Sequence, residues 1–141
     1  MSLNRALGIC AAGLSAQRTR MEIVASNLAN ARTTRTPEGG PYKRKEPVFT
    51  ADPIPSNFGD ELGVALKSVR VERIVEDPAP PVKKFEPGHP DADEAGFVSY
   101  PNVEPLQEMV DMLSATRSYE ANVTTVRSIR EMLRSALGIL R

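Results

Sequence analysis

Mostly apolar side chains recur every seven residues at each end of this 141-residue chain. The N-terminal repeat consists of Leu3, Cys10, Gln17, Val24 and Ala31, with Leu7, Leu14, Met21 and Leu28 in the interleaved positions. Two interleaved seven-residue repeats form one narrow stripe on a helix, as the a and d positions of a coiled coil do. We therefore predict a helix from about Leu3 to Asn30, ending before the threonines and the proline of Arg32–Pro37.

The C-terminal repeat predicts a second, broader helix. It consists of Met109, Thr116, Val123, Arg130 and Leu137, with Met112, Tyr119, Val126, Leu133 and Leu140 in the second set of positions. The residues that widen this face are Leu106, Val110, Leu113 and Ile129. We predict that the helix begins after Asn102, with Pro105 in its first turn, and ends near Gly138. A helix with so broad an apolar face requires more than one neighbour.

The middle of the chain is rich in proline and alternates between apolar and polar residues over short stretches. The candidate strands lie within Tyr42–Ala51, Val64–Val75, Val82–Phe85 and Phe97–Tyr100. Together they predict one small β unit of three or four strands. The expected fold is mainly α, with long N- and C-terminal helices forming a coiled coil and a short β-hairpin region between them. The expected divisions are an N-terminal helix over residues 1–31, a linker and β-rich region over 32–102, and a C-terminal helix over 103–141.

Neither terminal helix is expected to bury its stripe within so small a β unit. Burial of one Leu, Ile, Val or Met side chain stabilises a protein by roughly 1.5–3 kcal/mol, and the two stripes hold many of them. We therefore expect the helices to find partners only in other copies of the chain. Charged residues beside the stripes, such as Arg20, Glu108 and Asp111, are expected to pair between neighbouring subunits.

Composition excludes several classes of function. Eighteen basic and eighteen acidic residues cancel, whereas nucleic-acid binding needs a concentrated basic surface. Cys10 is the only cysteine, and its place in the repeat favours a small apolar side chain over a reactive thiol. Arg5 followed by apolar residues resembles a short signal peptide, but the seven-residue repeat continues unbroken to Leu28. We therefore expect no cleaved signal.

One cluster of residues, His89 to Glu94, has the composition of a metal site. Read as a calcium loop that begins at Asp91, it has the required Gly96 in the sixth position but Ala95 in the fifth and Asn102 in the twelfth. Two ligand positions are therefore wrong. A polar turn between strands is the favoured interpretation. We predict no catalytic residue, no cofactor site, no metal site and no small-molecule substrate.

Several ordered motifs carry a family resemblance. They are Gly13–Met21, Ala25–Ala31, Thr33–Thr36, Gly39–Lys45, Pro87–Asp93, Tyr100–Val103, Glu108–Met112 and Ala115–Asn122. These blocks resemble the signatures of bacterial flagellar rod and hook axial proteins, and within them those of the proximal rod. The resemblance covers well over half of the chain. Arg32 and Glu104 depart mildly from the pattern, without removing a motif.

The resemblance implies a structural subunit of the proximal rod in the flagellar basal body. Such subunits polymerise through their terminal helices into a drive shaft that transmits torque and forms the wall of the export channel. The implied partners are other copies of the chain, other proximal and distal rod proteins, the export-gate junction protein and the type III export apparatus. The implied location is the periplasmic rod, reached without a cleaved signal peptide.

Two other functions fit parts of the sequence. A secreted helical adaptor that forms a closed oligomer would also carry heptads at both ends, and a metal-dependent hydrolase would use the His89 loop. For the rod function, the residues expected at subunit interfaces are Leu7, Leu14, Gln17, Met21, Val24, Asn27, Leu28, Asn30, Met109, Met112, Tyr119, Asn122, Val123, Val126 and Leu133. Asn27 and Asn30 lie on one face near the helix end, where either capping or intersubunit hydrogen bonding is expected.

Overall fold

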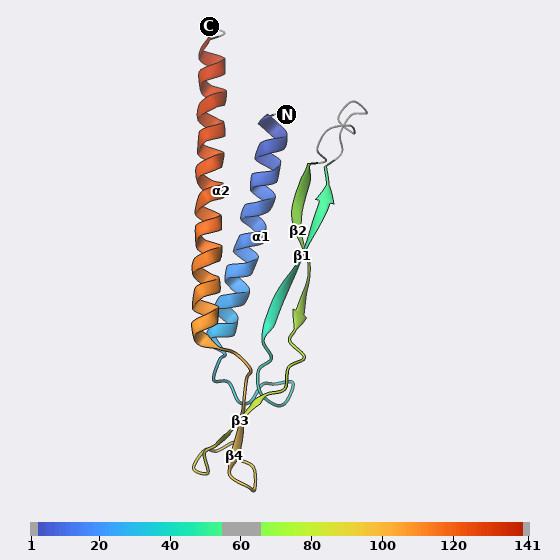
Figure 1. Cartoon of the computed structure of the whole chain (residues 1–141), viewed down its shortest axis with the longest axis vertical. Coiled ribbons are helices and arrows are strands. Elements are labelled where there is room, and N and C mark those ends of the chain that lie inside the picture. Colours follow the sequence, from blue (N-terminus) through green and yellow to red (C-terminus); the bar gives the residue numbers. More distant parts are fainter. Residues whose placement is uncertain (1–2, 55–65, 140–141) are drawn as a thin grey trace.

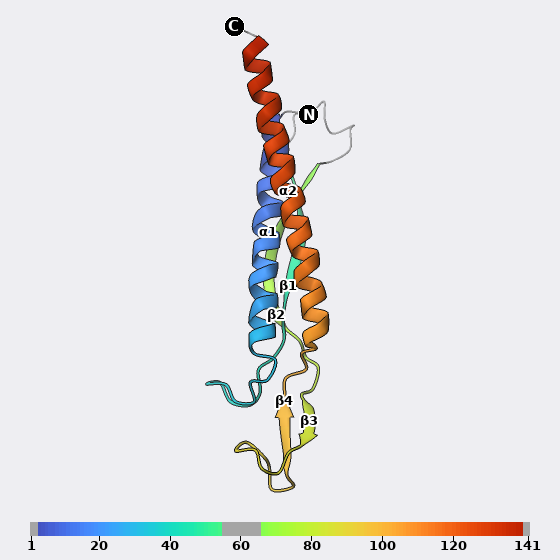
Figure 2. The ribbon, with the colours of Figure 1, turned by 90° about the vertical axis from the view of Figure 1, so that its left-hand side faces the viewer.

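The computed structural model describes residues 3–54 and 66–139 of the chain. Its elements, in order, are α1 (Leu3–Ala29), β1 (Lys45–Pro53), β2 (Lys67–Glu76), β3 (Val82–Phe85), β4 (Phe97–Tyr100) and α2 (Pro105–Ile139). The molecule is elongated (Figures 1 and 2): α1 and α2 run antiparallel, the β1–β2 ribbon lies along α1, and the β3–β4 ribbon projects beyond the helices at one end. At the other end α2 extends past the start of α1.

The two predicted helices are confirmed, and their ends follow from local chemistry. At the end of helix α1 the backbone N–H of Asn30 donates to the carbonyl oxygen of Ser26 at 3.0 Å, and the Asn30 side chain donates to the same oxygen at 2.9 Å, so this side chain supports the last turn. Helix α2 begins with Pro105 in its first position, where the missing N–H has no intrahelical partner to lose. Neither described helix is long and apolar enough to cross a membrane.

Helix α1 lies between two neighbours. It contacts α2 on one side and both strands of the β1–β2 ribbon on the other. The expectation that the helices find partners only in other copies of the chain is therefore wrong. The buried residues of α1 include Ala16 and Ile23, which lie outside the predicted narrow stripe, because the ribbon covers a face that the seven-residue repeat does not mark. The helices pair along their length, and a regular coiled coil stays a prediction.

The four predicted strands are confirmed, but they form two separate pairs rather than one unit. Antiparallel β1 and β2 pair from Lys45 opposite Glu76 to Pro53 opposite Lys67, with a register shift between Val48 and Phe49. Antiparallel β3 and β4 pair from Val82 opposite Tyr100 to Phe85 opposite Phe97. The predicted second strand began at residues 64 and 65, and those two residues lie outside the described part. Neither small ribbon encloses a core of its own.

Candidate assembly interface

The most buried polar side chain of α1 belongs to Asn27, which is 1% exposed. Its amide nitrogen donates to the carbonyl oxygen of Lys45 at 2.9 Å and to Oε2 of Glu108 at 3.1 Å. Its amide oxygen accepts from the backbone N–H of Lys45 at 2.9 Å and from the hydroxyl of Tyr42 at 3.0 Å. Both donors and both acceptor sites of the amide are therefore occupied within the chain.

Glu108 continues this network from the first turns of α2. Its carboxylate is fully buried and also accepts from Nε of Arg44 at 2.6 Å. One turn further along the face, Asp111 accepts from Arg20 of α1 at 2.9 Å. We call Arg20, Asn27, Arg44, Glu108 and Asp111 the buried polar network. It joins the end of α1, the start of α2 and the residues that lead into β1, so it fixes how the helix pair and the β1–β2 ribbon meet.

Opposite this network, α2 presents an apolar stripe to solvent. Leu106, Met109, Val110 and Leu113 are 64%, 46%, 53% and 59% exposed. They lie three or four residues apart, so they share one face of the helix. The buried Glu108 and Ala115 lie on the other face, toward α1. We call these four residues the α2 stripe. This exposed apolar stripe is the candidate protein–protein contact of α2.

The residues predicted at interfaces divide between the inner and outer faces of the helix pair. Val24 and Asn27 are buried, and Met109 is exposed within the α2 stripe. The remaining predicted residues, all half-buried, are Leu7, Leu14, Gln17, Met21, Leu28, Asn30, Met112, Tyr119, Asn122, Val123, Val126 and Leu133. Their role between subunits stays a prediction. The prediction left out Leu106, Val110 and Leu113, although their spacing beside Met109 signalled an apolar face broader than one seven-residue stripe.

Several charged pairs expected between subunits form within one chain instead. Arg20 binds Asp111, Glu108 binds Arg44, and Arg18 binds Glu22 at 2.9 Å. The antiparallel pairing of α1 with α2 places Arg20 beside Asp111, whereas Arg18 and Glu22 lie one turn apart within α1 and Arg44 reaches Glu108 from the segment before β1. The arginines farther along α2 are exposed and have no ion pair with any residue in the described part of the chain; they are Arg117, Arg127, Arg130 and Arg134.

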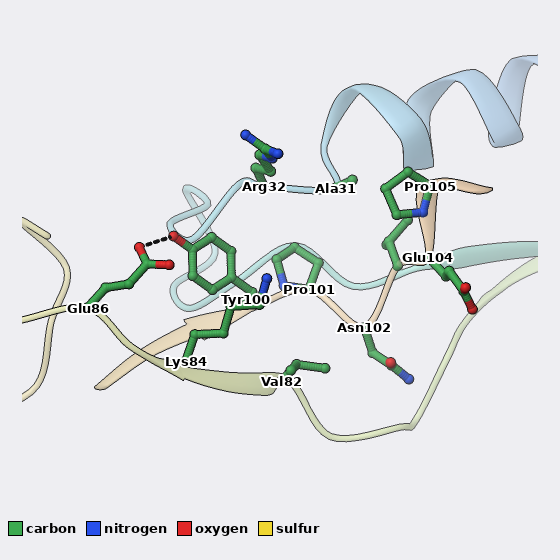
Figure 3. Close-up of a pocket in the computed structure, with 11 residues that line it drawn as sticks. Ala31, Arg32, Val82, Lys84, Glu86, Tyr100, Pro101, Asn102, Glu104 and Pro105 are labelled. Carbon is green, nitrogen blue, oxygen red and sulfur yellow. Dashed lines mark hydrogen bonds between the residues drawn. The ribbon is translucent and has the colours of Figure 1, made fainter. Parts of the chain in front are cut away.

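A pocket of about 570 Å³ lies where the end of α1 meets the β3–β4 ribbon and the start of α2. Figure 3 shows Arg32 on one side of it, Lys84 and Tyr100 on the ribbon, and Glu104 beside Pro105. Across the ribbon the hydroxyl of Tyr100 donates to Glu86 at 2.8 Å, and this bond raises the pKa of the tyrosine. The lining residues include no histidine, cysteine, serine or aspartate.

The His89 loop is a turn rather than a ligand set. The Asp93 carboxylate accepts from the backbone N–H groups of Ala95 and Phe97 at 3.0 and 2.8 Å, as side chains do in an Asx turn. The Asp91 carboxylate accepts from the Thr34 hydroxyl at 2.7 Å. Within residues 3–54 and 66–139, no three His, Cys, Asp or Glu side chains are grouped to hold a metal ion.

Comparisons with known proteins decide the family. Residues 9–35, mostly in α1, match the family model described as flagella basal body rod protein. Residues 94–139, which include β4 and α2, match the model described as flagellar basal body rod FlgEFG protein C-terminal. The chain is 41% identical to the flagellar basal-body rod protein FlgC of Borreliella burgdorferi, over 100% of this chain and 99% of that protein.

The chain belongs to the FlgC family of flagellar basal-body rod proteins. The FlgC proteins of Yersinia enterocolitica and Bacillus subtilis are 42% and 41% identical to it, each over 99% of this chain and over 98% and 99% of their own lengths. The chain is therefore a structural protein of the flagellar rod and not an enzyme.

Proposed function

We propose that this FlgC-family chain is an axial subunit of the proximal rod, which polymerises through its terminal helices. The α2 stripe carries the proposal, because its four neighbouring apolar side chains are exposed in the described part of the chain. Burial of its four side chains against neighbours would contribute several kcal/mol per subunit, at roughly 1.5–3 kcal/mol for each one fully buried.

The buried polar network supports the proposed role in a shaft. It ties both helices to the β1–β2 ribbon, so a load applied to one element passes to the others without a hinge between them. Repeated around and along a tube, such units would transmit torque, and the helices would form the wall of the export channel. The inferred partners are other copies of the chain, neighbouring rod proteins and the export-gate junction protein.

The proposed route to the rod is through the type III export apparatus into the periplasmic part of the basal body, without a cleaved signal peptide. The unbroken N-terminal helix supports this proposal. Cleavage after a signal-like segment would remove the first turns of α1, including Cys10, which is buried. A regular coiled coil between terminal helices of neighbouring subunits belongs to the same proposal.

The experiment compares Leu113→Asp with Ser114→Asp in a strain that depends on this chain for its rod. Both positions are exposed neighbours on α2, and the two changes introduce the same charge, but only Leu113 belongs to the α2 stripe. We expect Leu113→Asp to prevent recovery of the chain in purified basal bodies and to abolish motility, while Ser114→Asp has little effect. Normal incorporation of the Leu113→Asp chain would refute the role of the stripe.

A further inference from the structure

The β3–β4 ribbon has an aromatic face that the described residues, 3–54 and 66–139, leave largely open. Phe85 and Phe97 lie opposite each other with ring centroids 5.4 Å apart and planes at 65°, yet they are 64% and 41% exposed. Val98 points to the other face, because side chains alternate along a strand, and it is fully buried. The chain has four phenylalanines and no tryptophan. Two of the four phenylalanines therefore lie on one exposed face.

This aromatic face is held in a fixed arrangement although it is exposed. The ring of Phe85 lies against Gly96, whose φ is +81°, so closely that a Cβ atom there would stand 2.9 Å from the ring. Phe97 supports the same ring edge-to-face. Exposed aromatic side chains that are already ordered lose little entropy on binding, which is typical of interface anchors. The ribbon makes no contact with α1, α2, β1 or β2 in the described part of the chain.

The charges around this face indicate what covers it. Four exposed carboxylates surround the ribbon tip, on Glu86, Asp91, Asp93 and Glu94. None of them forms an ion pair with a described residue. A partner that fits this surface presents basic groups beside apolar side chains.

The projecting end of α2 has that chemistry. Arg130, Arg134 and Leu137 lie three or four residues apart, so they share one side of the helix. Leu137 is 66% exposed, and Met132 nearby is 52% exposed. This end and the ribbon lie at opposite extremes of the molecule (Figure 1). The two surfaces of one subunit therefore cannot meet each other, whereas those of successive subunits can, in a contact that does not close.

We propose that the Phe85–Phe97 face and acidic tip of the β3–β4 ribbon bind the basic, apolar end of the C-terminal helix of an adjoining axial subunit. The family model that spans residues 94–139 is named for the C-terminal part of FlgEFG proteins, so helices of this kind are not confined to one chain. This inference rests on the proposed function, and it adds a second contact that is distinct from the α2 stripe.

The test is a charge exchange in the full-length chain, with a second copy of the chain as the binding partner. Self-association of the purified chain is measured by sedimentation equilibrium in low-salt buffer. We expect Glu94→Lys and Arg134→Glu each to weaken association about two- to fivefold, the range of one exposed ion pair. Both changes in one chain should restore it, because the opposite charges meet again with reversed sign. Phe85→Ser should weaken association about tenfold or more.

Controls separate this contact from damage to the fold and from the proposed function. Glu38→Lys makes the same charge change in another exposed turn and should leave association unchanged. Rescue by the double exchange cannot arise from an unfolded ribbon, whatever Phe85→Ser does to stability. If the single exchanges weaken association but the double exchange does not rescue it, the assignment of the helix end as partner is overturned. If Leu113→Asp blocks incorporation into the rod while every ribbon variant associates normally, the proposed function stands and this inference is overturned.

Discussion

Replacing Asn27 by alanine should remove the side chain that joins α1, α2 and β1. The change removes the hydrogen bonds that the Asn27 amide makes to four groups: the N–H and the carbonyl of Lys45, the Tyr42 hydroxyl and one oxygen of Glu108. A neutral hydrogen bond contributes about 1 kcal/mol, and one to a charged group about 1.5–3 kcal/mol. Three neutral bonds and one to a carboxylate therefore sum to about 4.5–6 kcal/mol.

Two features of the structure reduce this sum. Lys45 is exposed, so water replaces part of the two bonds to its backbone. Arg44 continues to bind Glu108 after the change, so the buried carboxylate keeps a charged partner. We therefore expect Asn27→Ala to lower the free energy of unfolding by about 3–4 kcal/mol. The matched control is Asn30→Ala, which removes two neutral bonds, to Ser26 and Thr33; because Asn30 is only half-buried, water replaces part of both, and the change should cost about 1 kcal/mol.

The assay is urea unfolding of both variants, followed by far-ultraviolet circular dichroism of the two helices and extrapolated to water. If Asn27→Ala and Asn30→Ala lower the free energy of unfolding by amounts that agree within about 1 kcal/mol, the reasoning is refuted, since the two changes then remove equivalent interactions. Asn27→Asp extends the test. It places a second carboxylate against Glu108, so like charges destabilise the fold at neutral pH, and stability should recover on mild acidification as one carboxyl group takes up a proton. Loss of stability along the same pH change would contradict this.

The remaining predictions concern local packing and titration. Gly8→Ala should stabilise the chain by about 0.5–1 kcal/mol through helix propensity, because nothing lies within 4 Å of a Cβ there. Gly13→Ala should gain less or lose stability, because its Cβ would stand 3.1 Å from the Asn122 amide; equal thermal shifts for the two changes would show that α1 and α2 are less closely packed. Glu86→Gln should lower the pKa of Tyr100, which its hydrogen bond to Glu86 raises, with Glu94→Gln as control and tyrosinate absorbance as readout. That bond stabilises the fold below the ordinary tyrosine pKa of about 10, and the stabilisation is lost as pH rises through the raised pKa of Tyr100.

The helices and strands could be predicted because each carries its own period. The seven-residue repeat and the proline of the first turn predict α2. The alternation of apolar and polar residues in short segments predicts the strands. The neighbours of α1 could not be predicted in the same way. Ala16 and Ile23 are buried against elements far along the chain, and a period measured within one helix records only that a face is apolar. It does not say whether a second helix, a ribbon or another molecule covers that face.

The buried polar network also could not be predicted from local sequence patterns. Asn27 suggested a cap or a subunit contact, since asparagine near a helix end is common in both roles. Its actual partner Glu108 is 81 residues away in sequence, and Arg44 binds Glu108 across 64 residues. No local pattern links these three side chains. The antiparallel return of α2 along α1 brings Glu108 to Asn27, and the segment before β1 brings Arg44 to Glu108. The same helix pairing makes Arg20 and Asp111 an internal pair.

The pairing of the first helix with the last also governs when the fold can form. Arg20 and Asp111, which bind each other across the helix pair, are 91 residues apart in sequence. A chain that emerges from one end, during synthesis or through any narrow passage, has no α2 against which α1 can settle until nearly all of it has appeared. Closing so long a loop is slow compared with local helix formation. Whatever local helix it forms earlier, a threading chain therefore cannot pair α1 with α2 until its final segment is free, and the complete fold forms only then.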